Sequence, residues 1–102
     1  MHAVKSRTNC KSVDDVCRKF ISDSDYGKYL IHSTGHGIGL DVHEFPTIGP
    51  KSRTKLQNNM AITVEPGIYI PKKFGVRIED SLIVKDKKSL LLHKFTKELL
   101  TL

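Results

Sequence analysis

The sequence predicts an α+β fold in which one helix packs on a curved, mostly antiparallel sheet. Apolar side chains recur at helical spacing in residues 13–21, which indicates one amphipathic helix. After residue 39, short apolar or alternating runs are separated by glycine, proline and asparagine, a pattern typical of strands joined by turns. A chain of 102 residues is at most one domain, and such a domain buries only about 60 to 65% of its unfolded surface.

The helix is expected to begin at Ser12. This residue is a favourable N-cap, and Asp15 stands three residues later as in a capping box. The apolar stripe that follows consists of Val13, Val16, Cys17, Phe20 and Ile21. Residues 22–27, SDSDYG, favour turns and end the helix.

Strands are expected in the remainder of the chain, at Leu40–His43, Ala61–Tyr69, Val76–Val84 and Leu90–Lys94. Residues 46–59 carry proline, glycine and charge and are expected to form a surface loop. Segment 31–39 contains three glycines, so its backbone needs positive φ or a close approach to another group. The helix and strands each have one apolar face, so a second layer is expected from an absent N-terminal portion or another chain.

The composition excludes several classes of protein. Hydrophobic residues make up 38% and charged residues 27%, as in globular chains, and no apolar run approaches the roughly 20 residues of a membrane span. The basic N-terminus lacks the apolar stretch of a secretory signal, so we expect a cytoplasmic protein with no membrane partner. The charge of +6 could attract nucleic acid, but no aromatic side chains interleave the basic clusters, so no nucleic-acid partner is expected.

The two cysteines, Cys10 and Cys17, are expected to be free thiols. On a helix their spacing corresponds to about 10 Å of rise, which is beyond disulfide reach. The sequence has no C-x-x-C, and His2 is the only histidine near them, so a zinc finger is not expected.

Histidines concentrate in segment 31–44, IHSTGHGIGLDVHE. A lone histidine is usually a satisfied polar residue, but His32, His36 and His43 in one glycine-rich segment favour a functional site. Neutral imidazole is the commonest metal ligand, and glycine lets the backbone approach a site closely.

Two carboxylates, Glu65 and Glu79, lie inside otherwise apolar strands. An unpaired buried carboxylate costs several kcal/mol, so each needs a partner. One interpretation is a salt bridge between Glu79 and Arg77, which lie two residues apart and therefore on one strand face. With the histidines, a metal site is the favoured interpretation, and imidazole with carboxylate suits Mn²⁺ or Co²⁺.

These residues stand in three blocks that resemble the pita-bread metallopeptidases, the family that includes aminopeptidase P, prolidase and methionine aminopeptidase. The blocks are residues 32–44, HSTGHGIGLDVHE, residues 64–69, VEPGIY, and residues 75–80, GVRIED. They stand in the family's order, and the RIED block resembles the proline-directed branch. Residues 1–102 therefore resemble a single partial domain, the C-terminal half of the catalytic domain, with its N-terminal half and the N-terminal domain absent.

The resemblance implies that His36, Glu65 and Glu79 are metal ligands and that Glu79 bridges two divalent ions. Mn²⁺ is the expected ion, with Co²⁺ or Zn²⁺ as alternatives. The family's site also uses two aspartates from the preceding half, and no pair in this chain matches them. These three ligands alone are expected to hold two ions poorly.

The resemblance also implies hydrolysis of the peptide bond before proline, with catalytic roles for His32, His43, Arg77 and Glu65. His32 and His43 would contact the substrate and stabilise charge on the scissile carbonyl. Arg77 would orient Glu79, and Glu65 would take and return a proton. The two metal ions would lower the pKa of the attacking water. The isolated chain is expected to be inactive.

Two other functions stay open at this point. One is a noncatalytic pita-bread relative that binds a peptide or protein partner, and the other is a small basic nucleic-acid-binding domain. The partners of the favoured function, a proline dipeptidase or aminopeptidase P, are a peptide with proline at its second position and the absent half of the domain. A homodimer is also left open.

Overall fold

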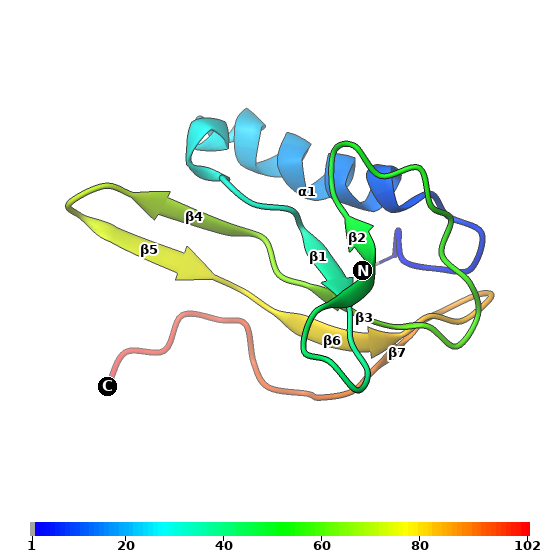
Figure 1. The fold of residues 1–102 in the computed structure, drawn as a ribbon. Coiled ribbons are helices and arrows are strands. Elements are labelled where there is room, and N and C mark those ends of the chain that lie inside the picture. The colour runs from blue at the N-terminus through cyan, green and yellow to red at the C-terminus, as the bar shows by residue number, and fades with distance from the viewer. Residues whose placement is uncertain (1) are drawn as a thin grey trace.

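The computed structural model describes residues 2–102. Within them, the helix α1 (Cys10–Asp23) lies across a five-stranded sheet of order β2-β1-β3-β6-β7, and β4 and β5 form a separate two-stranded ladder (Figure 1). All the strand pairings of this region are antiparallel. The predicted fold class, one helix on a mostly antiparallel sheet, is confirmed.

The remaining element bounds are η1 (Gly27–Tyr29, a 3₁₀ turn), β1 (Gly35–Gly37), β2 (Glu44–Ile48), β3 (Ala61–Val64), β4 (Gly67–Ile70), β5 (Phe74–Arg77), β6 (Asp80–Ile83) and β7 (Leu90–Leu91). The η1 turn was not expected from the sequence. Its backbone bonds run from Tyr29 N–H to the Tyr26 carbonyl and from Leu30 N–H to the Gly27 carbonyl.

The helix begins earlier than the sequence predicts. Asn9 is the N-cap, and its side-chain oxygen accepts a hydrogen bond from the Lys11 amide at 3.0 Å. Ser12 lies inside the helix, so the predicted capping box is wrong, and Asp15 pairs with the Lys11 ammonium at 2.8 Å. Asparagine caps a helix as well as serine does, and starting at Asn9 also buries Cys10 inside the core.

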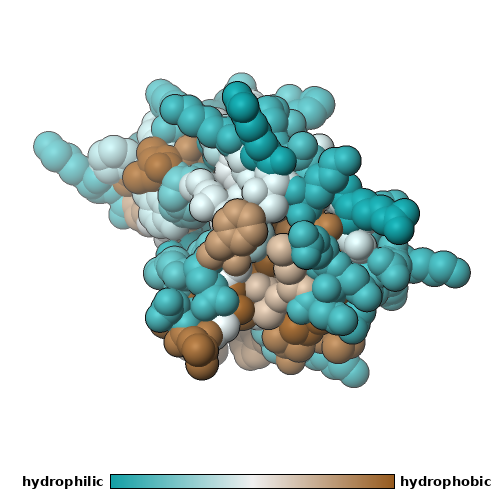
Figure 2. Space-filling view, turned by 45° about the vertical axis from the view of Figure 1, so that its right-hand side comes forward, coloured by the Kyte–Doolittle hydropathy of each residue, from teal (hydrophilic) through white to brown (hydrophobic). Residues whose placement is uncertain are grey.

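The apolar stripe of α1 is only partly covered. Val13 is buried, whereas Val16 is 56% and Phe20 is 74% exposed. Figure 2 shows hydrophobic side chains at the surface of one face of the molecule, interspersed with hydrophilic ones. The sheet therefore covers one edge of the stripe, and the rest faces outward.

The glycine-rich segment contains a strand that the sequence did not predict, and the predicted strand Leu40–His43 is wrong. Residues 39–43 form a bend that connects β1 to β2. Leu40 and Val42 point outward, with exposures of 106% and 74%. Apolar and polar residues alternate here without a strand. The segment is the bend of a hairpin, and Gly37 pairs with Glu44 across it.

The predicted surface loop 46–59 is also partly wrong. Its first three residues belong to β2, where Pro46 and Ile48 are buried. Leu56 is buried too, and its backbone bonds to Arg7 and Thr8 hold the rest of the loop against the N-terminal segment.

The predicted strands Ala61–Tyr69 and Val76–Val84 are each divided in two. The first breaks at Glu65 and Pro66 between β3 and β4, and the second breaks at Ile78 and Glu79 between β5 and β6. Pro66 has no N–H and cannot continue the ladder, which explains the first break. The two breaks face each other, since the Ile78 amide donates to the Pro66 carbonyl at 3.3 Å.

The hydrophobic core lies between α1 and the sheet. Its buried members are Val4, Cys10, Val13, Ile48, Leu56, Ile62, Val64, Leu82 and Val84. Ile62 and Val64 alternate with Thr63 along β3, so the opposite face of that strand is free to carry polar groups. Cys10 and Cys17 are free thiols, as predicted, and burial raises the pKa of both.

The buried carboxylate of Asp80 forms ion-pair contacts with the C-terminal segment. Asp80 is 1% exposed and lies 3.0 Å from the Lys97 ammonium, with the His93 ring 3.9 Å away. The predicted strand Leu90–Lys94 is shorter than expected, because regular pairing stops at Leu91. Beyond it, the Leu92 amide and the His93 ring still bond to the backbone of Ser81.

None of the helices in residues 2–102 has both the length and the apolar character that crossing a membrane requires.

A close approach accounts for the glycine at position 35. No glycine within residues 2–102 has positive φ, so of the two expected reasons for these glycines the structure shows the close approach. A Cβ at Gly35 would overlap the carbonyl oxygen of Thr63, and one at Gly37 would overlap that of Phe45. Glycine therefore lets β1 pass between β2 and β3.

Gly35→Ala is expected to lower the free energy of unfolding by about 1 to 3 kcal/mol or more, because rigid backbone must move to admit the methyl group. Gly39→Ala is the matched control, since the atoms nearest its new Cβ belong to the exposed Glu44 side chain. Urea denaturation of both variants measures the difference. Equal losses would contradict the close-packing explanation.

A buried ion pair ties α1 to the segment before β1. Asp14 is fully buried and accepts hydrogen bonds from Arg18 and from the Thr34 amide and hydroxyl. Burial alone would raise the pKa of Asp14, but the hydrogen bonds from Arg18 and Thr34 and the charge of Arg18 outweigh it. The pKa of Asp14 therefore lies below its usual value.

This lowered pKa predicts acid sensitivity. The unfolded chain takes up the proton first as the pH falls, so the stabilisation is complete above the ordinary aspartate pKa of about 3.9 and is lost progressively below it. The difference in unfolding free energy between the wild-type chain and Asp14→Asn should shrink below about pH 4. Denaturation between about pH 3 and pH 7 measures it, and a difference constant across that range would sink the idea.

Candidate functional site

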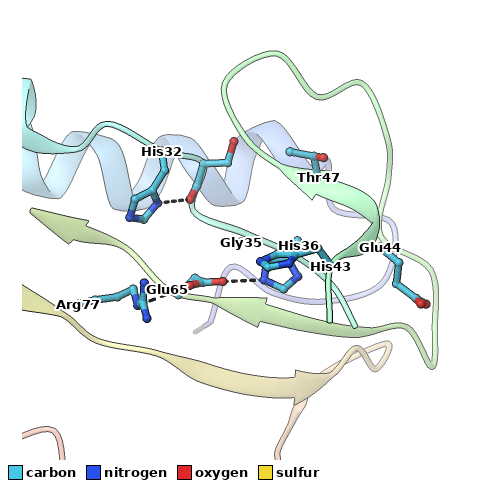
Figure 3. A pocket seen from close by; sticks show the side chains of 9 residues that line it. His32, Gly35, His36, His43, Glu44, Thr47, Glu65 and Arg77 are labelled. Atoms are coloured by element: carbon cyan, nitrogen blue, oxygen red, sulfur yellow. Dashed lines mark hydrogen bonds and ion pairs between the residues drawn. The ribbon is translucent and has the colours of Figure 1, made fainter. Parts of the chain in front are cut away.

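A cavity of about 490 Å³ opens on the face of the sheet opposite α1 (Figure 3). Its lining residues are His32, Ser33, Gly35, His36, His43, Glu44, Thr47, Glu65 and Arg77. The structure thus brings five of the six residues proposed from the sequence to one cavity. Glu79 is the exception and lies beside it, beyond Arg77.

His36 and Glu65 meet at the centre of this cavity. His36 Nε2 lies 2.8 Å from Glu65 Oε1, and both side chains are largely buried, at 17% and 14% exposure. The opposite ring nitrogen, His36 Nδ1, donates to the Gly37 carbonyl at 2.8 Å. Both ring nitrogens therefore face oxygen acceptors, so Nε2 and Glu65 must share either a proton or a cation.

The strand geometry places this pair. His36 is the middle residue of β1, while Glu65 directly follows β3, where the ladder stops. The Thr63 hydroxyl connects them, because it donates to Glu65 Oε1 at 3.0 Å and accepts from the His36 amide at 3.2 Å. The Glu65 amide donates to the Thr34 carbonyl at 2.6 Å, in register with the pairing of β1 and β3.

Arg77 stands between the two carboxylates. Its Nε lies 3.6 Å from Glu65 Oε2 and 3.9 Å from Glu79 Oε2. Charge-assisted hydrogen bonds are usually about 2.7 to 2.9 Å long, so neither contact is a tight salt bridge. The Tyr69 hydroxyl, and then the charges of Tyr69 and Glu65, raise the pKa of the Arg77 guanidinium above its usual value. Glu79 is thus not saturated by Arg77.

The other two histidines flank the central pair. His32 Nδ1 donates to the Ser33 carbonyl at 2.7 Å, so Nε2 is left to accept from the Tyr69 hydroxyl at 2.7 Å. His43 is exposed on the bend after β1, and its ring centroid lies 4.3 Å from that of His36. One imidazole is therefore held firmly, while the other lies at the open side of the cavity.

The donor set fits a divalent cation only in part. One imidazole and two carboxylates suit Mn²⁺, Co²⁺ or Zn²⁺, and His36 and Glu65 are adjacent with a fixed His36 tautomer. Glu79, by contrast, is turned to Arg77. Across residues 2–102, no three His, Cys, Asp or Glu side chains converge as a metal-binding group.

Sequence reasoning did not identify Thr63 and Tyr69 as parts of this site. Both had a signal that could have revealed them, because they are separated from Glu65 by two and four residues and would share its side in the predicted strand Ala61–Tyr69. Asp14 and Arg18 are spaced for a helical ion pair, but the spacing does not indicate that Thr34 would complete it.

A sheet of antiparallel strands with a His-Glu cavity, backed by one helix, defines a fragment of a pita-bread metallopeptidase domain. The chain matches metallopeptidase family M24 over residues 1–86. This chain belongs to that family.

Several relatives are highly similar. The Xaa-Pro dipeptidase of Pyrococcus furiosus is 45% identical over 100 residues, which cover 98% of this chain and 29% of the relative. A putative Xaa-Pro aminopeptidase of Mycoplasma pneumoniae is 47% identical over 92 residues, covering 90% of this chain and 26% of the relative. The chain thus spans less than a third of the length of these proteins.

The fold matches solved structures as well. The Xaa-Pro dipeptidase from Bacillus anthracis superimposes with a TM-score of 0.96 at 46% identity, over 99% of this chain and 28% of that protein. The prolidase from Pyrococcus furiosus gives a TM-score of 0.91 at 44% identity, over 94% of this chain and 28% of that one. The predicted family resemblance is confirmed.

Thr63→Val is expected to destabilise the chain by about 1 to 3 kcal/mol, because it leaves the His36 amide and Glu65 Oε1 without their shared partner. Thr47→Val is the control, since Thr47 lines the same cavity but is exposed, and a loss below about 0.5 kcal/mol is expected there. Denaturant titrations compare the two. A loss at Thr63 as small as that at Thr47 would mean that the bridge contributes nothing.

Proposed function

We propose that this chain is the C-terminal part of the catalytic domain of a metal-dependent Xaa-Pro peptidase, a proline dipeptidase or aminopeptidase P. The contact between His36 Nε2 and Glu65 Oε1 at 2.8 Å is the observation that carries the proposal. Both are donors that a divalent cation prefers, and the relatives of this chain include Xaa-Pro dipeptidases.

His36, Glu65 and Glu79 would hold the metal, with Mn²⁺ as the preferred ion and Co²⁺ or Zn²⁺ as alternatives. When bound, two divalent ions lower the pKa of water and polarise the scissile carbonyl. For Glu79 to take part, its side chain must leave Arg77. The long contact of 3.9 Å supports this, because little binding energy opposes the movement.

The remaining side chains of the cavity have separate tasks. His32, whose ring nitrogens bond to the Ser33 carbonyl and the Tyr69 hydroxyl, would contact the substrate peptide and orient it. His43, beside His36 at the open side, would stabilise charge on the scissile carbonyl. Glu65 would hold and return the proton, and Arg77 would orient Glu79 and balance the charge of the two carboxylates.

Residues 1–102 are proposed to be a partial domain that requires other segments to complete the site. The chain covers 29% of the Pyrococcus furiosus Xaa-Pro dipeptidase, and three donors do not converge in the described residues. Further carboxylate ligands would come from the absent half of the domain, and the isolated chain would be inactive. A cytoplasmic location belongs to the proposal and is consistent with two free thiols.

The test replaces the matching segment of the Pyrococcus furiosus Xaa-Pro dipeptidase with this chain. The chimera is expected to release proline from an Xaa-Pro dipeptide in the presence of Mn²⁺, whereas the isolated chain is not. His36→Ala and Glu79→Gln in the chimera should each lower kcat/KM by at least about a hundredfold, because each removes a ligand. Proline release is measured directly.

Asp15→Asn is the control in the same chimera, because Asp15 lies on the exposed side of α1 and should leave the activity unchanged. Proline release by the isolated chain would overturn its predicted inactivity. A folded chimera that binds Mn²⁺ without any turnover would favour a noncatalytic relative that binds a peptide.

A further inference from the structure

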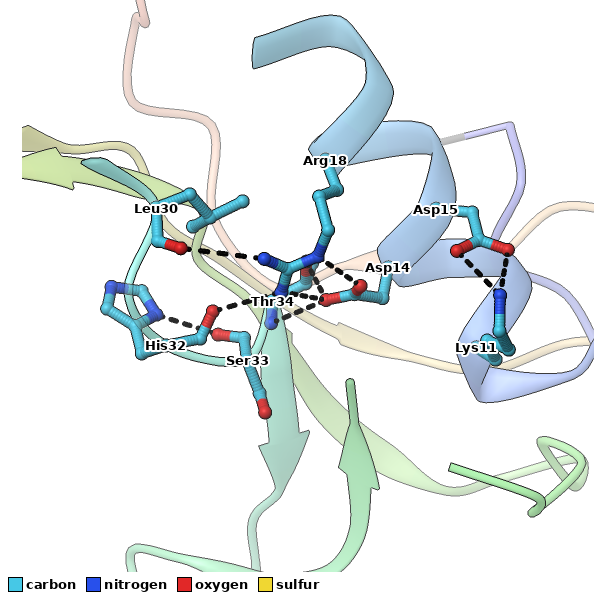
Figure 4. A network of polar contacts seen from close by, with 8 residues as sticks. All are labelled: Lys11, Asp14, Asp15, Arg18, Leu30, His32, Ser33 and Thr34. Atoms are coloured by element: carbon cyan, nitrogen blue, oxygen red, sulfur yellow. Dashed lines mark hydrogen bonds and ion pairs between the residues drawn. The ribbon is translucent and has the colours of Figure 1, made fainter. Parts of the chain in front are cut away.

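Beneath the cavity, α1 carries a buried ion pair that differs from the other pairs on this helix. Arg18 Nε donates to Asp14 Oδ2 at 2.8 Å, and Nη2 donates to Asp14 Oδ1 at 3.0 Å (Figure 4). The Asp14 side chain is 0% exposed. The pair between Lys11 and Asp15 has the same spacing, but both side chains are about half exposed, at 50% and 53%.

Arg18 extends past Asp14 to the backbone that carries His32. Its Nη2 donates to the His32 carbonyl at 3.3 Å, and Nη1 reaches the Leu30 carbonyl at 3.5 Å. This stretch precedes β1 and has no strand pairing within the described residues, so no ladder holds it. The planar guanidinium therefore holds the carbonyl groups of the residues on either side of Ile31, and so the backbone that carries His32, while Ser33 and Tyr69 hold its ring.

Asp14 acts in the same way on Glu65, through one intermediate. Its Oδ1 accepts from the Thr34 hydroxyl at 2.8 Å and from the Thr34 amide at 3.2 Å. The carbonyl of Thr34 in turn accepts from the Glu65 amide at 2.6 Å. Glu65 follows the last residue of β3, and this bond continues the antiparallel register in which Gly37 of β1 pairs with Ile62 of β3.

We propose that Asp14 and Arg18 are positioning residues, which set the relative placement of His32 and Glu65 from the opposite face of the sheet. The roles of His32 and Glu65 in catalysis rest on the proposed function, but their placement does not. A misplacement of about 1 Å costs an active site on the order of a hundredfold in rate. Buried hydrogen bonds that hold both residues in place, called the Asp14–Arg18 clamp, would therefore preserve the rate.

The first test is NMR spectroscopy of the 102-residue chain, without metal or substrate. Arg18→Lys keeps the charge but loses the fork, so the imidazole signals of His32 are expected to move. Asp14→Asn is expected to move the amide signal of Glu65. The methyl signals of Ile62 and Leu82 in the core report whether each variant remains folded.

Two further variants keep the test decisive. Asp15→Asn alters an ion pair of the same spacing on the same helix and should leave the signals of His32 and Glu65 in place. Thr34→Val removes only the hydroxyl bond to Asp14, so it should move the Glu65 amide signal even if Asp14→Asn does not fold. Unmoved His32 and Glu65 signals in folded Arg18→Lys and Thr34→Val chains would overturn the proposal.

The second test uses the chimera described above. Arg18→Lys is expected to lower kcat by about tenfold or more with unchanged Mn²⁺ content, whereas Asp15→Asn leaves kcat unchanged. Unchanged kcat in Arg18→Lys would count against a positioning role. If the unsubstituted chimera is inactive, the proposed function fails, and the NMR result alone still decides whether the clamp exists.

Discussion

The interruption of the long hairpin at Pro66 is the constraint on which the site depends. Pro66 lacks the N–H that would continue the pairing of β3 with β6 into that of β4 with β5, so regular pairing stops directly after Glu65. The Glu65 amide still bonds on the β1 side, to the Thr34 carbonyl at 2.6 Å, in the register in which Gly37 pairs with Ile62. The second break, at Glu79, lies opposite the first, and both carboxylates thus sit where regular pairing stops.

The two faces of the sheet carry different side chains: one face packs in the core and the other lines the cavity. Ile62 and Val64 pack toward α1, while Thr63 between them faces the cavity and bridges His36 to Glu65. The period of two along a strand makes this division unavoidable. Asp14 and Arg18 connect the two faces, because they lie under the segment from which the histidines emerge. A single helix consequently supports both the core and the site.

The sequence predicted which side chains gather at one cavity better than it predicted the bounds of the helices and strands. His36 and Glu65 were recognisable because imidazole in a glycine-rich segment and carboxylate in an apolar strand are both costly without partners. The helix start was misplaced, because Asn9 and Ser12 are equally good caps and only burial of Cys10 distinguishes them. The strand at Leu40–His43 failed because alternation alone does not show that Gly37 and Glu44 must pair across a bend.

The open face of the cavity sets the strength of its electrostatics. Arg77 and Glu79 are about half exposed, with side-chain exposures of 52% and 43%. Unit charges about 4 Å apart interact by about 1 kcal/mol in water but by about 4 kcal/mol at the dielectric constant typical near a protein surface. In this chain water screens that pair. Covering the cavity would exclude that water and strengthen the contact between Arg77 and Glu79, so the strength of this ion pair depends on what lies over the open face as well as on the distance between the charges.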